Sequence, residues 1–267
     1  MELTELDKLE LTELFERGMT IERKFNCMGE RKKLEFEGDL CMRIYDKDKL
    51  DNHYNNILKN NIDKIMLGGV GDTLLYDAKD DARMSLVVLI RMSSNITNNI
   101  IRHMEELKLL EPDLYYYPQE DFHITVMDIL KGELGRTIPA NINEYINTIS
   151  RCAEEISAFE ILFDGMTASD NVALVKGYYE ESLEVFRKML RDNLKQQGLP
   201  LEERYETFSS HISVARIPNK LKNPNEYIDF IGRNCTFGIM KVKSFEICFH
   251  NWYDSQKTVL TKIQLRT

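Results

Sequence analysis

Two short stretches decide the fold of this chain: DFHITVM at residues 121–127 and SSHISVA at residues 209–215. Each contains a histidine, an apolar residue, a hydroxyl residue and a valine in the same order. Because alternate side chains of a strand share a face, His123 would point to the same side as Thr125, and His211 to the same side as Ser213. The apolar residues would point the other way. Each stretch therefore predicts a strand that packs on a core and opens to a cleft.

The residues on the polar face of these strands are suited to chemistry at phosphorus. Two histidines that face each other across a cleft can act as general base and general acid in one in-line displacement. The hydroxyls of Thr125 and Ser213 can donate to non-bridging phosphoryl oxygens, where negative charge must be stabilised. No set of metal ligands accompanies the motifs, so neither a metal nor another cofactor is expected. The alternative interpretation is that both pairs of side chains are hydrogen-bonded for structure alone.

The composition is that of an ordinary globular protein, with 43% hydrophobic and 30% charged residues among 267. This length suffices for one large domain or a two-lobed unit. A net charge of −9 argues against an extended binding surface for duplex DNA or long RNA. We expect a small nucleotide, an oligonucleotide or one RNA end as the partner. The sequence does not indicate an oligomeric state.

The five cysteines are scattered and lack any Cys-x-x-Cys pair, which predicts reduced thiols. The first residues are acidic where a signal peptide would be basic, and no run is apolar enough to span a membrane. These features predict a cytoplasmic protein with no membrane partner.

Apolar spacing predicts regular elements along the rest of the chain. Helices are expected at residues 2–17, 51–66, 95–110, 143–157, 181–197 and 224–231. Further strands are expected at residues 86–90, 159–164, 172–178, 240–249 and 258–266. Each half then follows the order strand, helix, histidine strand, helix and strand, which indicates an architectural duplication.

The two motifs resemble the mark of the two-histidine (2H) phosphoesterase superfamily, which includes 2′-5′ RNA ligase-like proteins and cyclic nucleotide phosphodiesterases. That motif consists, in order, of His, an apolar residue, Thr or Ser, and a second apolar residue. It occurs here as HITV at residues 123–126 and HISV at residues 211–214. The resemblance covers about residues 81–266. It implies an α+β fold with two pseudo-symmetric lobes, each an antiparallel sheet flanked by helices, and a central cleft. Residues 81–267 would form this bilobal domain, and residues 1–80 a helical N-terminal extension that packs on it.

The resemblance implies a catalytic role for His123 and His211 as the acid–base pair, without deciding which is the base. Thr125 and Ser213 would bind the phosphate. Arg216 is a further phosphate-binding candidate, although strict alternation puts it opposite His211. It would reach the cleft only if the strand bends before Pro218, and it would otherwise form a surface ion pair.

Four other side chains are weaker candidates. Tyr117 belongs to the loop at residues 115–117, which could stack a base or pack in the core. His53 and His103 are expected to be partly exposed or satisfied locally, and His250 to serve the turn at residues 251–255. None of these three histidines is expected to contact a ligand.

Three functions remain open at this point. The first is a metal-independent phosphodiesterase that hydrolyses a 2′,3′-cyclic phosphate, a related cyclic nucleotide or a 2′-5′ bond. The second is a non-catalytic nucleotide sensor that uses the same cleft. The third is an RNA end-joining ligase that runs the reverse reaction with the same groups.

Overall fold

The computed structural model describes residues 42–72, 75 and 81–266 of the chain. The helix predicted at residues 2–17 lies outside the described residues. Contacts group Met42–Thr267 into one compact unit. Within the described part of the chain, no helix is both long and apolar enough to cross a membrane.

The helices form close to where apolar spacing predicts them. Asp46 begins the first by accepting a hydrogen bond from the Lys49 amide at 3.3 Å. The helices are α2 (Lys47–Met66), α3 (Ser94–Leu110), α4 (Ile142–Glu154), α5 (Glu181–Gln196) and α6 (Pro224–Ile231), with a 3-10 turn η2 (Gln119–Asp121). The five predicted helices among the described residues are therefore confirmed, with small changes at their ends.

One sheet has four antiparallel strands in the order β3-β1-β8-β9. Its strands are β1 (Arg83–Arg91), β3 (His123–Leu134), β8 (Ser244–Asn251) and β9 (Lys257–Gln264). Helix α5 contacts β3, α4 contacts β9, and the two helices pack on each other. The first histidine motif thus lies on an outer strand of a sheet that has helices on its other face.

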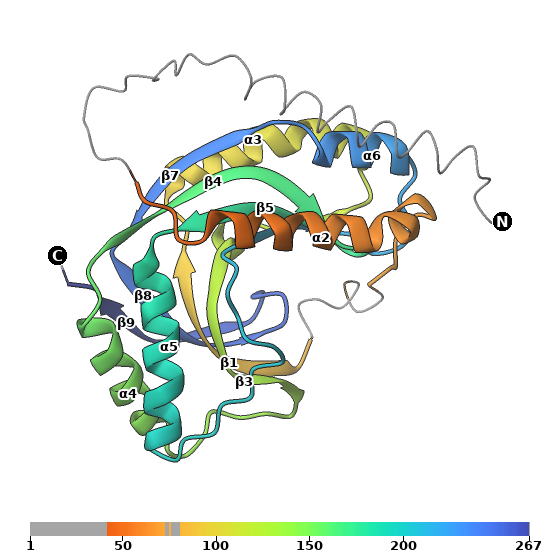
Figure 1. The fold of residues 1–267 in the computed structure, drawn as a ribbon. Helices are drawn as coiled ribbons and strands as arrows, with labels where there is room; N and C mark the ends of the chain where they lie inside the picture. The colour runs from red at the N-terminus through yellow and green to blue at the C-terminus, as the bar shows by residue number, and fades with distance from the viewer. Residues whose placement is uncertain (1–41, 73–74, 76–80, 267) are drawn as a thin grey trace, which may run out of the picture. The chain divides into compact units, whose positions relative to one another are not determined.

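The second sheet has five antiparallel strands in the order β2-β6-β5-β4-β7. Its strands are β2 (Tyr115–Tyr116), β4 (Phe159–Ala168), β5 (Val172–Tyr179), β6 (Ile212–Arg216) and β7 (Thr236–Val242). Figure 1 shows α2, α3 and α6 beside this sheet, and α4 and α5 beside the other. The predicted fold class, α+β with two antiparallel sheets flanked by helices, is confirmed.

The single strand predicted at residues 240–249 is wrong. The structure divides it into β7 and β8, which belong to different sheets, with Lys243 between them. Buried Val242 and Phe245 lie on either side of the crossing. Local hydrophobicity therefore continues through the point where the chain changes sheets, and only the tertiary structure reveals the break.

The motif strands bury their apolar faces as predicted. Ile124, Val126, Ile212 and Val214 are each at most 1% exposed and belong to one core cluster. Burial of a side chain of this size contributes roughly 1.5–3 kcal/mol. Both strands are therefore held from behind by the core, which leaves their polar faces free.

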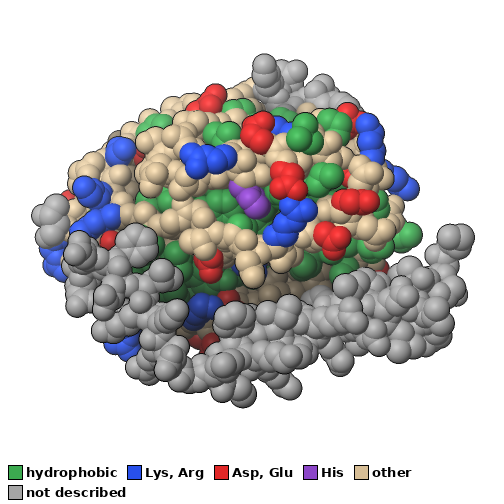
Figure 2. All heavy atoms as spheres, turned by 90° about the horizontal axis from the view of Figure 1, so that it is seen from above, with side chains coloured by type: hydrophobic (Ala, Val, Ile, Leu, Met, Phe, Trp, Pro, Cys, Tyr) green, Lys and Arg blue, Asp and Glu red, His purple; other side chains and the backbone are tan. Residues whose placement is uncertain are grey.

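The outer surface over the five-stranded sheet carries charges of both signs. Figure 2 shows lysine and arginine side chains interspersed with acidic ones and small apolar areas on the described part of this face. A mixed surface of this kind fits the net charge of −9 and is unlike the continuous basic surface that a nucleic-acid duplex requires.

Candidate active site

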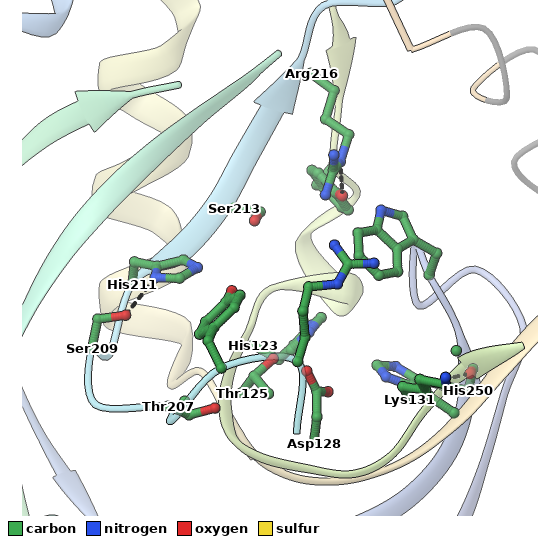
Figure 3. Close-up of a pocket in the computed structure, with 16 residues that line it drawn as sticks. His123, Thr125, Asp128, Lys131, Thr207, Ser209, His211, Ser213, Arg216 and His250 are labelled. Carbon is green, nitrogen blue, oxygen red and sulfur yellow. Dashed lines mark hydrogen bonds between the residues drawn. The ribbon is translucent and has the colours of Figure 1, made fainter. Parts of the chain in front are cut away.

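Both histidine motifs line one pocket. His123 and Thr125 reach it from β3, His211 from the residue just before β6, and Ser213 from β6 itself. Figure 3 shows these side chains arriving from different strands of the two sheets. The pocket lining also includes Ser85, Tyr117, Asp128, Lys131, Gly132, Arg204, Tyr205, Thr207, Ser209, Arg216, His250 and Trp252. All six predicted site residues therefore lie together.

The ring of His123 is held in one tautomer. Its Nδ1 lies 2.7 Å from the carbonyl oxygen of Asp121, which can only accept, so Nδ1 carries the proton. Burial lowers the pKa of His123 to about 4, against an opposing effect of the Asp254 charge. At neutral pH this imidazole is uncharged, and its Nε2 has a lone pair available to take a proton.

His211 has a more adaptable partner. Its Nδ1 lies 3.0 Å from the hydroxyl of Ser209, which can donate or accept. Burial lowers the pKa of His211 to about 4, and the positive charges of Arg187 and Arg216 act in the same direction. When Ser209 donates to Nδ1, the proton of the neutral ring is on Nε2. The two rings can therefore carry opposite proton arrangements at the same pH.

Arg216 lines the pocket even though strict alternation puts it opposite His211. The pairing of β6 with β5 shifts by one residue: Ala215 pairs with Ala173, but Ser213 pairs with Leu174. Val214 is the extra residue, and a shift of this kind moves later side chains to the other face. The prediction from alternation is thus corrected by an irregularity within β6.

The Arg216 guanidinium is anchored by two groups. Its Nε donates to the Tyr117 hydroxyl at 2.6 Å, and its Nη1 lies 3.7 Å from a carboxylate oxygen of Asp72. Tyr117 is only 7% exposed and packs edge-on against Tyr115. Of the two roles considered for Tyr117, this environment favours support of Arg216 from a packed position over stacking of a base.

A register shift in β3 explains why Asp128 also lines the pocket. Thr125 pairs with Leu89 of β1, but Met127 pairs with Val88, so one residue of β3 is extra. After this shift Asp128 lies on the same face as Thr125. Burial raises the pKa of the Asp128 carboxyl. Simple alternation could not have found this residue.

His250 is the main residue that sequence reasoning missed. As expected, it supports the turn that follows it, because its Nδ1 bonds to Asp254, but it also lines the pocket and is 6% exposed. Its spacing of four residues from Asp254 is the one sequence signal that could have indicated a histidine–carboxylate pair. His53 and His103 do not line this pocket. Both of these residues are partly exposed, as expected, although the buried Nε2 of His103 has no hydrogen-bond partner among the described residues.

Arg187 of α5 joins the two motif segments from inside the core. This fully buried side chain donates to the carbonyl oxygen of Val126 at 2.8 Å and to that of Ser209 at 2.7 Å. One guanidinium therefore bridges β3 and the segment before β6. Hydrogen bonds from a buried charge are among the stronger ones, so this contact holds the two motifs at a set separation.

Other expectations concern metals and thiols. Across residues 42–72, 75 and 81–266, no group of three or more histidine, cysteine and acidic side chains could hold a metal ion. The described cysteines, Cys152, Cys235 and Cys248, are free thiols.

The fold and the pocket define a class: α+β proteins with two antiparallel sheets that present a paired histidine motif to one cleft. Comparison with solved structures finds the same fold in proteins of very different sequence. The structure of TT0787 of Thermus thermophilus matches with a TM-score of 0.54 and 18% identity, over 68% of this chain and 98% of that one. The structure of E. coli LigT complexed with 3′-AMP matches with a TM-score of 0.50 and 14% identity, over 69% of this chain and 99% of that one.

These likenesses show that the chain shares its fold with both proteins. Neither a protein-family model nor a curated protein matches the sequence.

Proposed function

We propose that this protein is a metal-independent phosphodiesterase that hydrolyses a 2′,3′-cyclic phosphate, a related cyclic nucleotide or a 2′-5′ phosphodiester. One observation carries the proposal: two imidazoles and two hydroxyls from two different sheets line the same pocket. General acid–base catalysis at phosphorus needs both groups within reach of one substrate atom, and such a pocket meets that need.

In this proposal His123 is the base and His211 the acid for hydrolysis. The Asp121 carbonyl keeps the His123 proton on Nδ1, which supports proton removal from water by Nε2. His211 would take up a second proton as the anionic substrate binds, with the Ser209 hydroxyl accepting from Nδ1–H. The imidazolium would then give its Nε2 proton to the leaving oxygen and become neutral. The phosphorus–oxygen bond to water forms as the bond to the leaving oxygen breaks. His123 then returns to its starting state by releasing one proton to solvent.

Phosphate binding falls to the hydroxyls of Thr125 and Ser213 and to Arg216. The two hydroxyls would donate to the non-bridging oxygens, and the guanidinium would add a positive charge near Ser213. Support comes from the fixed position of Arg216, which Tyr117 and Asp72 hold before any substrate arrives. A preorganised donor loses less entropy on binding than a mobile one.

The proposed substrate is a small nucleotide or an RNA end. E. coli LigT, which has the same fold, has been crystallised with 3′-AMP. A net charge of −9 also favours a small ligand over a long polyanion. A cytoplasmic location remains part of the proposal.

The direct test is turnover of nucleoside 2′,3′-cyclic phosphates and 2′-5′ dinucleotides in EDTA, followed by product chromatography. We expect H123A and H211A each to lose about a hundredfold or more of kcat/KM, since a general acid or general base contributes that much to the rate. Circular dichroism and thermal unfolding should show both variants folded. H103Q, which alters a histidine outside the pocket lining, is the matched control and should keep its activity.

Each alternative predicts a different outcome. Binding of the cyclic phosphate without any product would favour the sensor, and joined product from cyclic-phosphate and 5′-hydroxyl ends would favour the ligase. Full activity in both histidine variants would reject the acid–base assignment.

A further inference from the structure

A third imidazole lies beside His123 in the same pocket. His250 is on β8 and pairs with Ser85 of β1. Strand β1 lies between β8 and β3, the strand of the first motif. The ring centroids of His250 and His123 are 5.6 Å apart, with the rings nearly perpendicular. Figure 3 shows His250 across the pocket from His211. This separation is short enough for both rings to contact one phosphoryl group.

Asp254 fixes the orientation of this ring. The Nδ1 of His250 donates to Oδ1 of Asp254 at 2.7 Å, and the Asp254 side chain is fully buried. Arg91 donates to the same oxygen at 3.2 Å, and Lys257 to the other oxygen at 3.0 Å. Burial alone would raise the pKa of Asp254, but the hydrogen bonds from His250 and Arg91 outweigh it and hold that pKa well below its usual range. The carboxylate is therefore ionised and keeps a proton on Nδ1 of His250.

The second ring nitrogen of His250, Nε2, is available to a ligand in the pocket. No hydrogen bond to its Nε2 is made by any residue within the described ranges. The turn that follows is closed by its own backbone: the Asp254 amide donates to the Asn251 carbonyl at 3.0 Å, and the Asn251 amide to the Gln256 carbonyl at 2.9 Å. The imidazole also supports this turn through the contact of Nδ1 with Asp254, but that contact does not use Nε2.

Besides the histidines, three cationic side chains line the pocket: Arg216, Lys131 and Arg204. Arg216 is engaged with Tyr117 and Asp72 on the Ser213 side. Lys131 is paired with Glu133 at 3.0 Å and more than half exposed. Arg204 also lines the pocket, with its guanidinium 5.2 Å from the centre of the Trp252 ring, and its charge acts on Asp128. The charged or titratable groups near His250 are therefore His123, Asp128, Arg204 and the Asp254 cluster with Arg91 and Lys257.

We propose that His250 is a third substrate-contacting histidine, whose Nε2 takes up one proton from solvent when an anionic phosphoryl group binds and then donates to a non-bridging oxygen beside Thr125. Asp254 acts as a positioning residue that stabilises the resulting imidazolium. This inference rests on the proposed function, because it assigns a ligand contact within the same pocket. His250 would then supply a positive charge to the phosphoryl group near Thr125, as Arg216 would near Ser213.

Nuclear magnetic resonance of the wild-type protein provides the first test. The chain has five histidines, so their imidazole signals can be assigned one by one. We expect inorganic phosphate at about neutral pH to shift the signals of His123, His211 and His250, and the nitrogen shifts of His250 to change from the neutral to the doubly protonated form. The signals of His103 should stay unchanged.

Two substitutions separate ligand contact from support of the turn. In H250N the amide can still donate to Asp254 but nothing replaces Nε2, whereas in H250Q a polar group remains near the Nε2 position. We expect H250N to bind phosphate about tenfold or more weakly, as for loss of a charge-assisted hydrogen bond, with its unfolding midpoint almost unchanged. H250Q should recover part of the affinity.

The outcomes separate the two proposals. If phosphate shifts His123 and His211 but not His250, or if H250N binds phosphate as tightly as the wild type, the third-histidine proposal is overturned and the proposed function stands. If none of the three rings responds to phosphate or to a cyclic nucleotide, both are overturned.

Discussion

His123 and His211 have the same type of side chain and nearly the same environment, but different partners. Burial lowers the pKa of each to about 4. A carbonyl fixes the proton of His123, whereas a hydroxyl leaves that of His211 free to move. The motif in the sequence shows that two imidazoles are present, but the difference between them comes from Asp121 and Ser209, whose contacts the sequence does not reveal.

The lowered pKa values predict a pH dependence of stability. The unfolded chain takes up protons at these histidines below about pH 6.5, whereas the folded chain resists until about pH 4. Because the unfolded state binds more protons in that window, the free energy of unfolding should fall as the pH decreases through it. Each ring should contribute roughly 1–3 kcal/mol.

Urea unfolding at several pH values between these limits measures this effect. The double variant H123Q/H211Q should lose less stability on acidification than the wild type, because every other titrating group is common to both. Parallel curves would show that the two rings are not buried in the folded protein.

At the scale of elements, irregular strands shape the pocket as much as regular ones do. The extra residue Val214 in β6 turns Arg216 toward the pocket, and a similar shift in β3 brings Asp128 there. A residue alternation rule assumes uniform pairing, and it fails where one strand has an additional residue. The sequence therefore predicts the histidine–hydroxyl pairs, which precede each shift, and misplaces the side chains that follow.

Close packing of β5 against the second motif gives a prediction for Gly177. A Cβ at this position would overlap the carbonyl oxygen of Ser210, which is backbone and cannot move aside alone. The Tyr54 hydroxyl joins the same two residues: the amides of Gly177 and Ser210 each donate to it at 3.3 Å. We expect G177A to lose about 1–3 kcal/mol of unfolding free energy and to displace His211.

Chemical unfolding and phosphate binding together check this expectation. G232A is the matched control, because a Cβ at the end of α6 meets only ordinary contacts there. Unchanged stability and unchanged phosphate affinity in G177A would contradict the close approach of β5 to the motif.

At the scale of the whole molecule, α2 belongs to the structure that supports the site. Tyr54 of this helix is fully buried, and its hydroxyl also donates to the Gly177 carbonyl at 2.9 Å. Contacts place α2 in the unit formed by Met42–Thr267. The sequence predicts a domain boundary after residue 80, where the family resemblance begins, and that boundary stays a prediction.

Two shortened chains decide between these boundaries. A chain that begins at Met42 should unfold at nearly the same temperature as the full chain and bind phosphate equally well. A chain that begins at residue 81 should be much less stable, because it leaves Ser210 and Gly177 without Tyr54 and exposes core around β5. Equal stability of the two shortened chains would contradict a supporting role for α2.

The sequence alone determined the two strands with one polar and one apolar face, the helices of the described region and the α+β class. The strands and helices depend on local periodicity, which neighbouring residues express directly, whereas the α+β class was implied by the family resemblance of the two motifs. Only the tertiary structure decided that both motifs share one pocket, that Arg187 bridges them, that β7 and β8 separate into two sheets, and that His250 joins the site. Each of these depends on residues far apart in the chain or on one additional residue in a strand, and the spacing of side chains carries no record of either.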